Sequence, residues 1–391
     1  MVVDVDTAPS CYPDDAIGWY VHLPFCTTKC GYCDFYSLPT IPALVDRLVD
    51  SIGKELGLRN PRRPVESVFI GGGTPTVLPA KAMESLLETV AGLAGPVAEF
   101  TVEANPSSAD ELKLELLRRW GVNRISFGAQ SFNVNELATL ERLHDPAHIG
   151  QCVSAAREAG FDNLNLDLIY SIPGQSVASW LDSLRRAIEL SPEHLSCYCL
   201  MYEQGTSLTR LRNAGKIVPV DEDLEVAMFE ATVETLTAAG YEHYEVSNFA
   251  KCGRRCRANL IYWENREYLG IGPSAVSYLD GLRSRNVPDV RRYVELMGID
   301  PAAVICETER LGPRERAGET AVQMLRLTAG IDLRRFRRQT GQDAARLFHE
   351  PIERLVGLGL LDARAESISL TRRGMLVANR VMEEFLPQPG D

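Results

Sequence analysis

Short apolar runs alternate with longer amphipathic segments along the first half of the chain. The runs are rich in β-branched and aromatic residues, which is typical of buried strands. They begin near Gly18, Glu66, Ala98, Arg124, Asn163 and His194. The intervening segments carry apolar residues at helical spacing and span Ala43–Gly57, Ala80–Ala94, Ala109–Trp120, Ile149–Gly160 and Ser176–Leu190. Six strand–helix units in succession predict a parallel sheet with right-handed crossovers.

Six units are too few for a closed barrel of eight strands. We therefore expect an α/β fold, a partial (β/α)6 barrel with one open side, and a doubly wound sheet is the alternative. Near residue 240 strands and turns replace the repeating units, and from about Glu307 the pattern is mostly helical. A helix, a Gly-containing turn, the short strand SISL and another helix near the C-terminus are typical of a small winged-helix-like domain. The predicted units are an N-terminal tail (1–16), the barrel (17–240), an extension (241–305) and the C-terminal domain (306–391).

Composition and charge narrow the class of protein. The 391 residues are 45% hydrophobic and 24% charged, which is ordinary for a globular protein and excludes disorder. With 41 basic and 53 acidic residues the net charge is −12, which argues against nucleic-acid and anionic-lipid partners. No apolar run approaches the roughly 18 residues that span a bilayer. The acidic N-terminal segment is unlike a signal peptide. We expect a cytoplasmic protein without stable membrane insertion.

Cysteine spacing gives the strongest chemical signal. The chain has ten cysteines, and in a reducing compartment closely spaced ones are typical of metal or redox ligands. Cys26, Cys30 and Cys33 follow the first predicted strand with the spacing C-x3-C-x2-C. Thiolates on so short a loop can converge on one iron–sulfur cluster, and three of them leave one iron of a 4Fe–4S cube open for another ligand. A zinc site, the alternative, needs a fourth ligand nearby.

Glycine and polar residues follow or end the next predicted strands. The run Gly71–Pro75 (GGGTP) follows the second strand, and its bare backbone allows close approach to a ligand. Glu103 ends the third predicted strand, Gln130 the fourth and Asp167 the fifth. The carboxyl ends of the strands carry the active site in a β/α barrel. These residues and the cysteine loop therefore predict one shared site.

The segment YVHLPFCTTKCGYCDF resembles the signature of the radical S-adenosylmethionine (SAM) superfamily. Its Tyr-x-His-x-Pro-Phe-Cys lead-in is similar to the HemN/HemW branch, and NLIYW and the LTRRG tail resemble the HemW members. The resemblance runs from about Gly18 to Phe385. It implies that Cys26, Cys30 and Cys33 bind a 4Fe–4S cluster whose open iron holds SAM, which one-electron reduction cleaves to methionine and a 5′-deoxyadenosyl radical. It also assigns cofactor-binding positions to Tyr20, Tyr32, Gly72, Gly73, Thr74, Glu103, Gln130, Arg142, Asp167 and Val276.

The HemW members are haem chaperones, so the resemblance implies a protein that binds SAM and haem and delivers haem to an acceptor, such as a respiratory protein. A flavodoxin or ferredoxin is the electron donor that it implies, and no catalytic residue is assigned. Two alternatives stay open: a radical SAM C-methyltransferase that uses two SAM molecules, and an oxygen-independent coproporphyrinogen III oxidase of porphyrin biosynthesis. Phe35 stands where those oxidases carry a fourth cysteine, which disfavours the second alternative.

The chain departs from the HemW pattern at two positions. HemW members read His-Asn-x-x-Tyr-Trp and Gly-x-Gly-x-x-Ala-His, whereas this chain has Ala258 and Val276 in place of the two histidines. Imidazole is a natural axial ligand of haem iron. We therefore expect weak haem binding that depends on the aromatic faces of Tyr262 and Trp263.

Other candidate ligands lie elsewhere in the second half of the chain. His243 is the one remaining histidine near the HemW-like segment, although a half-buried strand residue is the favoured interpretation. Cys197 and Cys199 are two apart on a predicted strand, and Cys252 and Cys256 are four apart on a loop. An auxiliary metal site formed by these four cysteines is an alternative to ordinary unpaired thiols.

Overall fold

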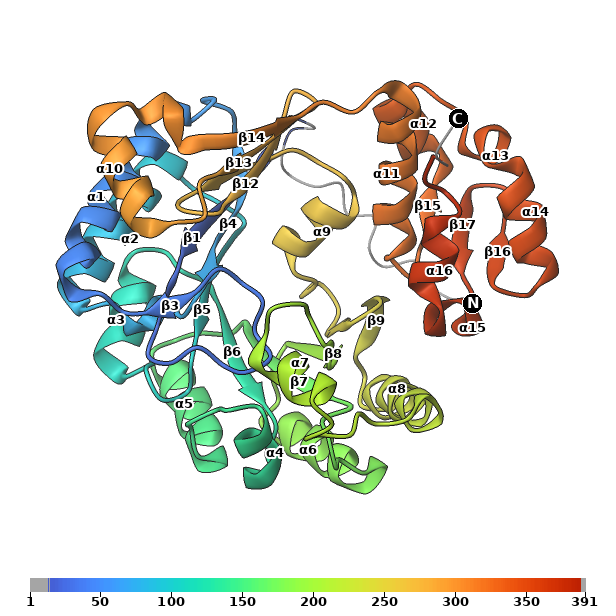
Figure 1. Ribbon diagram of the computed structural model, residues 1–391, viewed down its shortest axis with the longest axis horizontal. Coiled ribbons are helices and arrows are strands. Elements are labelled where there is room, and N and C mark those ends of the chain that lie inside the picture. Colours follow the sequence, from blue (N-terminus) through green and yellow to red (C-terminus); the bar gives the residue numbers. More distant parts are fainter. Residues whose placement is uncertain (1–12, 14, 388–391) are drawn as a thin grey trace.

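The structure is a computed structural model that describes residue 13 and residues 15–387. Most of the predicted tail (1–16), including Cys11, lies outside the described residues. The six predicted strands are present and pair in parallel in chain order, as Figure 1 shows. They are β1 (Ile17–Leu23), β4 (Val65–Gly72), β5 (Glu99–Ala104), β6 (Arg124–Gln130), β7 (Leu164–Tyr170) and β8 (His194–Cys199).

Helices cover the outer, convex face of this sheet (Figure 1). They are α1 (Pro42–Arg59), α2 (Ala80–Ala94), α3 (Glu111–Arg119), α4 (Val134–Thr139), α5 (Pro146–Glu158), α6 (Val177–Glu189) and α8 (Glu222–Ala238). The 3-10 turn η1 (Pro75–Val77) follows β4, and the short α7 (Ser207–Asn213) lies against Gly31, whose carbonyl accepts from Leu208 N–H over 2.8 Å. In α2, Met83, Leu86, Leu87 and Val90 are fully buried at the spacing of one helix face.

Two helices begin two or more residues away from their predicted first residue. Helix α3 begins at Glu111 instead of Ala109, because the side chain of Asp110 accepts the backbone N–H of Lys113. Helix α5 begins three residues before the predicted Ile149, because Asp145 caps it and Pro146 takes the first position, where proline is favoured.

The sheet continues beyond both ends of the parallel block. On one side β11 (Tyr268–Ile271) pairs in parallel with β1, followed by antiparallel β12 (Val276–Leu279), β13 (Leu282–Asn286) and β14 (Ile305–Glu309). On the other side β8 pairs with β10 (Asn248–Ala250), and β10 pairs with β9 (Glu242–Glu245). Helix α10 (Val290–Ile299) and the turn η2 (Pro301–Val304) lie between β13 and β14. Because β14 and β9 are separate edges, the barrel is open, and the predicted α/β partial barrel is confirmed.

A second hydrophobic core forms the C-terminal part. It contains α11 (Pro313–Leu325), α12 (Leu333–Thr340), α13 (Ala344–Leu347), α14 (His349–Gly357), α15 (Arg372–Leu376) and α16 (Ala378–Glu383), with a small sheet of β15 (Ile331–Asp332), β17 (Ser367–Leu370) and β16 (Leu361–Ala363). Helices around a small antiparallel sheet match the predicted winged-helix-like domain. The predicted boundary at 305/306 falls inside β14.

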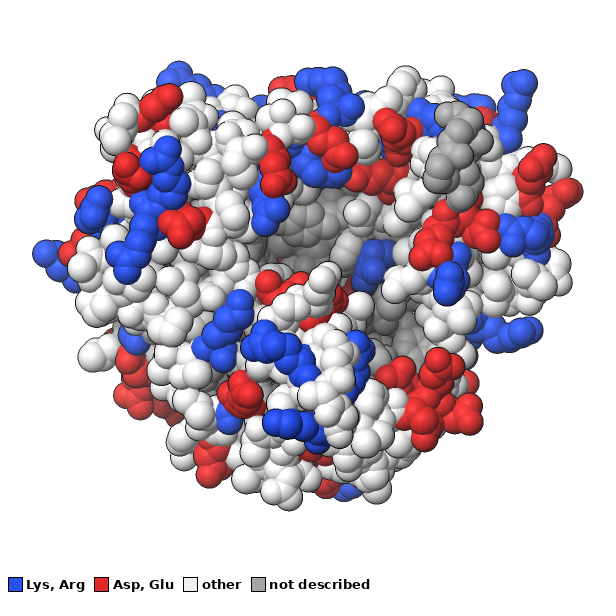
Figure 2. Space-filling model, viewed as in Figure 1, with Lys and Arg blue, Asp and Glu red and all other residues white. Residues whose placement is uncertain are grey.

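The two cores meet along α9 (Arg257–Trp263) and the β9–β10 hairpin. Val246 N–H donates to Arg326 C=O over 3.0 Å, and Thr328 N–H donates to Tyr244 C=O over 3.0 Å. Helix α9 lies on the concave side of the sheet in Figure 1, and the surface is hollowed between the two parts in Figure 2. Of the helices that the structure describes, none has the length and apolar character to cross a bilayer.

Candidate functional site

The cysteine loop follows β1 and is closed at its base by a short pair of strands. Strand β2 (Phe25–Cys26) pairs with β3 (Leu38–Pro39), so the loop returns to its starting point. The three cysteines are partly buried. Each sulfur has a polar side chain beside it: Thr74 Oγ1 donates to Cys26 Sγ over 3.7 Å, Arg142 Nη1 donates to Cys30 Sγ over 3.4 Å, and Ser37 Oγ lies 4.0 Å from Cys33 Sγ.

The donor set of this loop suits an iron–sulfur cluster better than a single metal ion. Among the described residues, no group of three or more His, Cys, Asp or Glu side chains converges on one point that could hold an ion. In a 4Fe–4S cluster each thiolate binds a different iron, so such convergence is not required. Burial raises the pKa of Cys26 and of Cys33, so these thiols lose their protons readily only when a metal takes the proton's place.

The glycine run after β4 packs directly against the cysteine loop. Gly72 has φ +107°, and a Cβ there would lie 2.4 Å from the ring of His22. A Cβ on Gly73 would lie 2.4 Å from the carbonyl oxygen of Phe25. Only glycine fits these two positions, because a side chain on either one would collide with β1 or with the start of the cysteine loop. The N–H of Gly72 donates to Glu103 Oε2 over 3.0 Å.

His22 joins the glycine run to the cysteine loop. Its Nε2–H donates to the carbonyl of Tyr36, three residues after Cys33, over 2.9 Å, and the hydroxyl of Tyr20 donates to its Nδ1 over 3.0 Å. Burial lowers the pKa of His22, which keeps the ring neutral with its proton on Nε2. The hydrogen bond to His22 therefore orients the hydroxyl of Tyr20, a residue that the family resemblance assigns to cofactor binding.

Three more of the predicted residues gather over Gly128 of β6. The guanidinium of Arg142 donates through Nη2 to Gly128 C=O over 2.5 Å and reaches Cys30 through Nη1. A Cβ on Gly128 would lie 2.9 Å from Nε2 of Gln130, which ends β6 with φ +64°. Burial raises the pKa of Tyr32, on the cysteine loop, and the nearby positive charge of Arg142 lowers it.

Asp167 is in the middle of β7 and not at its end, which corrects the sequence prediction. Its side chain faces the inner side of the sheet, where Ser126 Oγ donates to Oδ2 over 3.0 Å and Asn165 Nδ2 donates to Oδ1 over 2.9 Å. Side chains alternate between the two faces along β7, so Asp167 shares the inner face with Asn165, two residues earlier. Burial, and then the charge of Asp167, raises the pKa of Glu103 to about 7.

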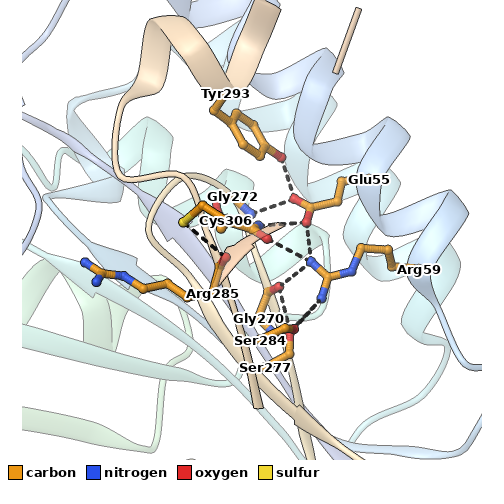
Figure 3. A network of polar contacts seen from close by, with 10 residues as sticks. Glu55, Arg59, Gly270, Gly272, Ser277, Ser284, Arg285, Tyr293 and Cys306 are labelled. Atoms are coloured by element: carbon orange, nitrogen blue, oxygen red, sulfur yellow. Dashed lines mark hydrogen bonds and ion pairs between the residues drawn. The ribbon is translucent and has the colours of Figure 1, made fainter. Parts of the chain in front are cut away.

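A polar network behind the site was not predicted (Figure 3). The carboxylate of Glu55 on α1 accepts hydrogen bonds from Gly272 N–H over 2.9 Å, Tyr293 Oη over 2.5 Å and Asn286 Nδ2 over 2.7 Å, and it pairs with Arg59 over 2.5 Å. It fixes the turn between β11 and β12, where a Cβ on Gly272 would lie 2.5 Å from the carbonyl oxygen of His22. The apolar pattern of α1 does not distinguish a buried glutamate from an exposed one, so Glu55 could not be identified from that pattern.

Val276 is the one predicted cofactor residue that the fold sets apart from the others. It begins β12, and both β11 and β1 lie between β12 and the rest of the parallel sheet. Its carbonyl oxygen would lie 2.0 Å from a Cβ on Gly270, so this backbone approach requires glycine. The structure therefore brings nine of the ten predicted positions to the carboxyl half of the parallel sheet and leaves Val276 on the antiparallel extension.

The α9 region contains no histidine at either position where the resemblance expects one. Ala258 is 7% exposed in the first turn of α9, and its N–H donates to Glu99 Oε1 over 3.3 Å. The ring of Tyr262 packs edge-on against Tyr268 at 4.6 Å between centroids. The indole of Trp263 lies 4.3 Å from the guanidinium carbon of Arg326.

The alternative ligands in this region are engaged in other contacts. The ring of His243 stacks on Phe249 with centroids 4.4 Å apart, in agreement with its interpretation as a half-buried strand residue. Cys256 is buried, and its Sγ donates to Glu99 Oε1 over 3.5 Å. Cys197 is buried in the main core while Cys252 is exposed, so the structure gives no support to an auxiliary site formed by these cysteines.

Comparisons with known proteins agree with this geometry. Residues 20–187 match the model of the radical SAM superfamily, and residues 311–377 match the HemN C-terminal domain. The chain is 34% identical to the heme chaperone HemW of Bacillus subtilis, with 94% of this chain and 98% of that protein covered, and equally identical to HemW of Escherichia coli, with the same coverage. The structure of coproporphyrinogen III oxidase (HemN) from Escherichia coli is similar with a TM-score of 0.82, 25% identity and 96% and 91% of the two chains covered.

These matches, and the cysteine loop at the carboxyl edge of an open parallel sheet, determine the family. The radical SAM domain implies a 4Fe–4S cluster and SAM as cofactors. The chain belongs to the HemW family of radical SAM proteins.

Proposed function

We propose that this protein is a haem chaperone that binds a 4Fe–4S cluster, SAM and haem, and passes haem to an acceptor protein. One observation carries the proposal: three thiols and the polar residues of four neighbouring strands meet at one edge of the sheet, in a chain related over nearly its whole length to heme chaperones. When bound and reduced, the cluster supplies one electron to SAM. A flavodoxin or ferredoxin is the proposed source of that electron.

Cys26, Cys30 and Cys33 hold the cluster in this proposal. Arg142 donates a hydrogen bond to the sulfur of Cys30, and such a bond stabilises the more negative, reduced state of a cluster. The bare backbone of Gly72 and Gly73, which packs against the cysteine loop, takes the methionine part of SAM together with Thr74.

The remaining SAM contacts come from polar side chains around this backbone. An ionised Glu103 attracts the cationic sulfonium and amino groups, because opposite charges in a partly buried site attract strongly. Tyr20, Tyr32, Gln130 and Asp167 complete the walls of the SAM site. Val276 acts from the antiparallel extension, through the turn that Glu55 holds.

Haem binds beside α9 in this proposal, against the aromatic side chains of Tyr262 and Trp263. Because Ala258 and Val276 supply no imidazole, axial ligation is weak and dispersion contacts with the macrocycle dominate. His243 and Cys256 would have to leave a ring stack and a buried hydrogen bond to reach the iron.

The missing histidines also favour a second candidate function, a radical SAM C-methyltransferase that uses two SAM molecules. This candidate needs the SAM site but no haem ligand, which is the combination of residues that the chain retains. The coproporphyrinogen III oxidase alternative needs a cysteine where Phe35 stands, 63% exposed beside the cysteine loop.

An anaerobic assay of the reconstituted protein tests the proposal. Purified protein is loaded with iron and sulfide, reduced with dithionite, and given SAM and haem. We expect cluster absorbance, slow formation of 5′-deoxyadenosine and a haem Soret band that an acceptor protein removes. A protein that takes up no haem, but transfers a labelled methyl group from SAM to a substrate, would replace the chaperone with the methyltransferase.

A further inference from the structure

The inner face of the sheet carries a buried chain of polar side chains below the proposed SAM site. It starts at Asp167 on β7 and passes through Asn165, two residues earlier, to His194 at the start of β8. Asn165 is 1% exposed and His194 is 0% exposed. From His194 the series of hydrogen-bonded side chains continues to Tyr244 on β9 and ends at Asn259 on α9. Residues from three strands and one helix are thus joined side chain to side chain.

The hydrogen bonds that link these five side chains all have the same donor-to-acceptor direction. Burial and the charge of Arg124 lower the pKa of His194, so its ring is neutral and carries one proton. Asn165 Oδ1 can only accept, so the proton is on Nδ1, which donates over 2.7 Å. Nε2 therefore accepts from the hydroxyl of Tyr244 over 2.8 Å.

The two ends of the chain complete this direction. The amide of Asn259 donates to the hydroxyl oxygen of Tyr244 over 3.5 Å, at the long limit of a hydrogen bond. At the other end, Asn165 Nδ2 donates to Asp167 Oδ1 over 2.9 Å, and Ser126 donates to Oδ2 of the same carboxylate over 3.0 Å. Every donor along the path therefore points from α9 toward Asp167. Aligned hydrogen bonds polarise one another in a low-dielectric interior.

We propose that this chain of side chains positions the Asp167 carboxylate from α9, so that SAM binding at Asp167 and the placement of α9 are linked. The inference rests on the assignment of Asp167 to the SAM site in the proposed function. His194 and Tyr244 are positioning residues, since each acts on the ligand through another side chain. A ligand that binds the Asp167 carboxylate favours the orientation that this series of hydrogen bonds maintains, and the same series reaches α9 through Asn259.

The energetic argument depends on burial. Removing the hydroxyl of Tyr244 leaves Nε2 of His194 without its donor in the protein interior, and an unsatisfied buried acceptor is costly. The His194 ring is then free to rotate, which removes the fixed donor to Asn165 and loosens the orientation of Asp167. Helix α9 loses its contact with Tyr244 in the same step.

The test uses the pair Tyr244→Phe and Tyr241→Phe in the reconstituted full-length protein. Both tyrosines are buried and each loses one hydroxyl, but Tyr241 donates to the carbonyl of Pro192 over 2.7 Å, outside the chain. SAM affinity is measured by anaerobic calorimetry, and amide hydrogen exchange of α9 is followed with and without SAM. We expect Tyr244→Phe to weaken SAM binding roughly tenfold, about 1.4 kcal/mol, and to abolish the protection that SAM gives to α9. Tyr241→Phe should stay within about twofold of wild type in SAM affinity, about 0.4 kcal/mol, and keep that protection.

The other outcomes overturn the inference. Wild-type affinity and wild-type protection of α9 in Tyr244→Phe would show that the chain positions nothing, and equal losses in both variants would show a general effect of destabilisation. If Tyr244→Phe does not fold, Asn259→Ala breaks the same chain at its half-buried end and should reduce the α9 protection by SAM; unchanged protection overturns the inference. A wild-type protein that binds cluster but no SAM would overturn the proposed function itself, and this inference with it.

Discussion

The cysteine loop and the α9 region differ in how many of their expected ligand-binding groups are present. At the cysteine loop, each thiol has a polar neighbour, two glycines pack closely against the loop, and charged side chains from neighbouring strands face inward. In α9 and at the start of β12, the positions where the family resemblance places histidines hold alanine and valine, and the aromatic rings of α9 are packed against their own neighbours.

This difference separates the two parts of the proposed function, the binding of a cluster and SAM and the binding of haem. The residues proposed to hold a cluster and SAM are present, whereas the two histidines that the family resemblance leads us to expect are replaced by Ala258 and Val276. A site whose donors are fixed by backbone and by buried hydrogen bonds is lost in one step when a donor is removed. Haem binding by stacking and dispersion is spread over many atoms, so single changes there have smaller effects. The predictions below test this contrast.

The largest effect is expected at the thiols. Replacement of Cys26, Cys30 and Cys33 by Ala should abolish iron binding, because no other three cysteines of the described residues share one short loop. Iron content and visible absorbance after anaerobic reconstitution measure the loss. The control replaces the exposed Cys252 and Cys306 by Ala and should retain wild-type iron. Stoichiometric iron in the triple variant would move the cluster elsewhere.

The next effect concerns the glycine run. Gly72→Ala forces a Cβ onto the His22 ring at φ +107°, so the backbone that faces the proposed SAM site must shift. We expect a roughly hundredfold loss of SAM affinity, about 2.8 kcal/mol, with the cluster retained. Gly92→Ala is the control, since this glycine is exposed in α2 with open space around it, and alanine there should stabilise the protein by about 0.5–1 kcal/mol. Unchanged SAM affinity in Gly72→Ala would remove the glycine run from the site.

Sequence periodicity was sufficient to predict the six strand–helix units that form the outer half of the fold. Apolar residues at helix or strand spacing face the core, and burial of apolar surface dominates folding, so the six units follow from the pattern. The antiparallel extension and the winged-helix-like domain were less well defined because their strands are only two to five residues long. Two of the pairings, β11 with β1 and β15 with β17, also join parts of the chain that are far apart in sequence.

The inner, polar half of the site could be predicted only in part. The cysteines and the glycine run were found because their spacing is local. His194 was given no role from the sequence, although His194, Ser196 and Tyr198 alternate with apolar residues in β8 and so share its inner face. Its function as a link between Asn165 and Tyr244 depends on contacts across about 30 and 50 positions of sequence, which no local pattern encodes.

A moderate, pH-dependent effect is expected at Glu103, whose pKa is raised from 4.5 to about 7. A carboxyl with a raised pKa in the folded state contributes stability that is fully present below pH 4.5 and is lost as the pH rises through 7. Relative to Glu103→Gln, which does not ionise, the wild-type protein without SAM should therefore lose about 2 kcal/mol of unfolding free energy between pH 4.5 and pH 8.

Denaturant unfolding of both proteins at several pH values measures this difference. SAM affinity should change in the opposite direction, because the cationic ligand binds the ionised carboxylate, and should increase from pH 6 to pH 8 in the wild-type protein only. A stability difference that does not vary with pH would show that Glu103 stays ionised throughout this range, and its charge would then not respond to SAM.

The smallest effect is expected at α9, where Ala258→His restores an imidazole at the position of the family histidine. Ala258 is 7% exposed, so the larger ring must displace its neighbours, and part of the ligation energy is spent on that rearrangement. We expect a tenfold gain in haem affinity, about 1.4 kcal/mol, and a sharper Soret band. Ala302→His, at an exposed position between α10 and β14, controls for haem that binds any added histidine. If the wild-type protein already binds haem as tightly as Ala258→His, another side chain ligates the iron, and the contrast between a complete cluster edge and an incomplete haem region is wrong.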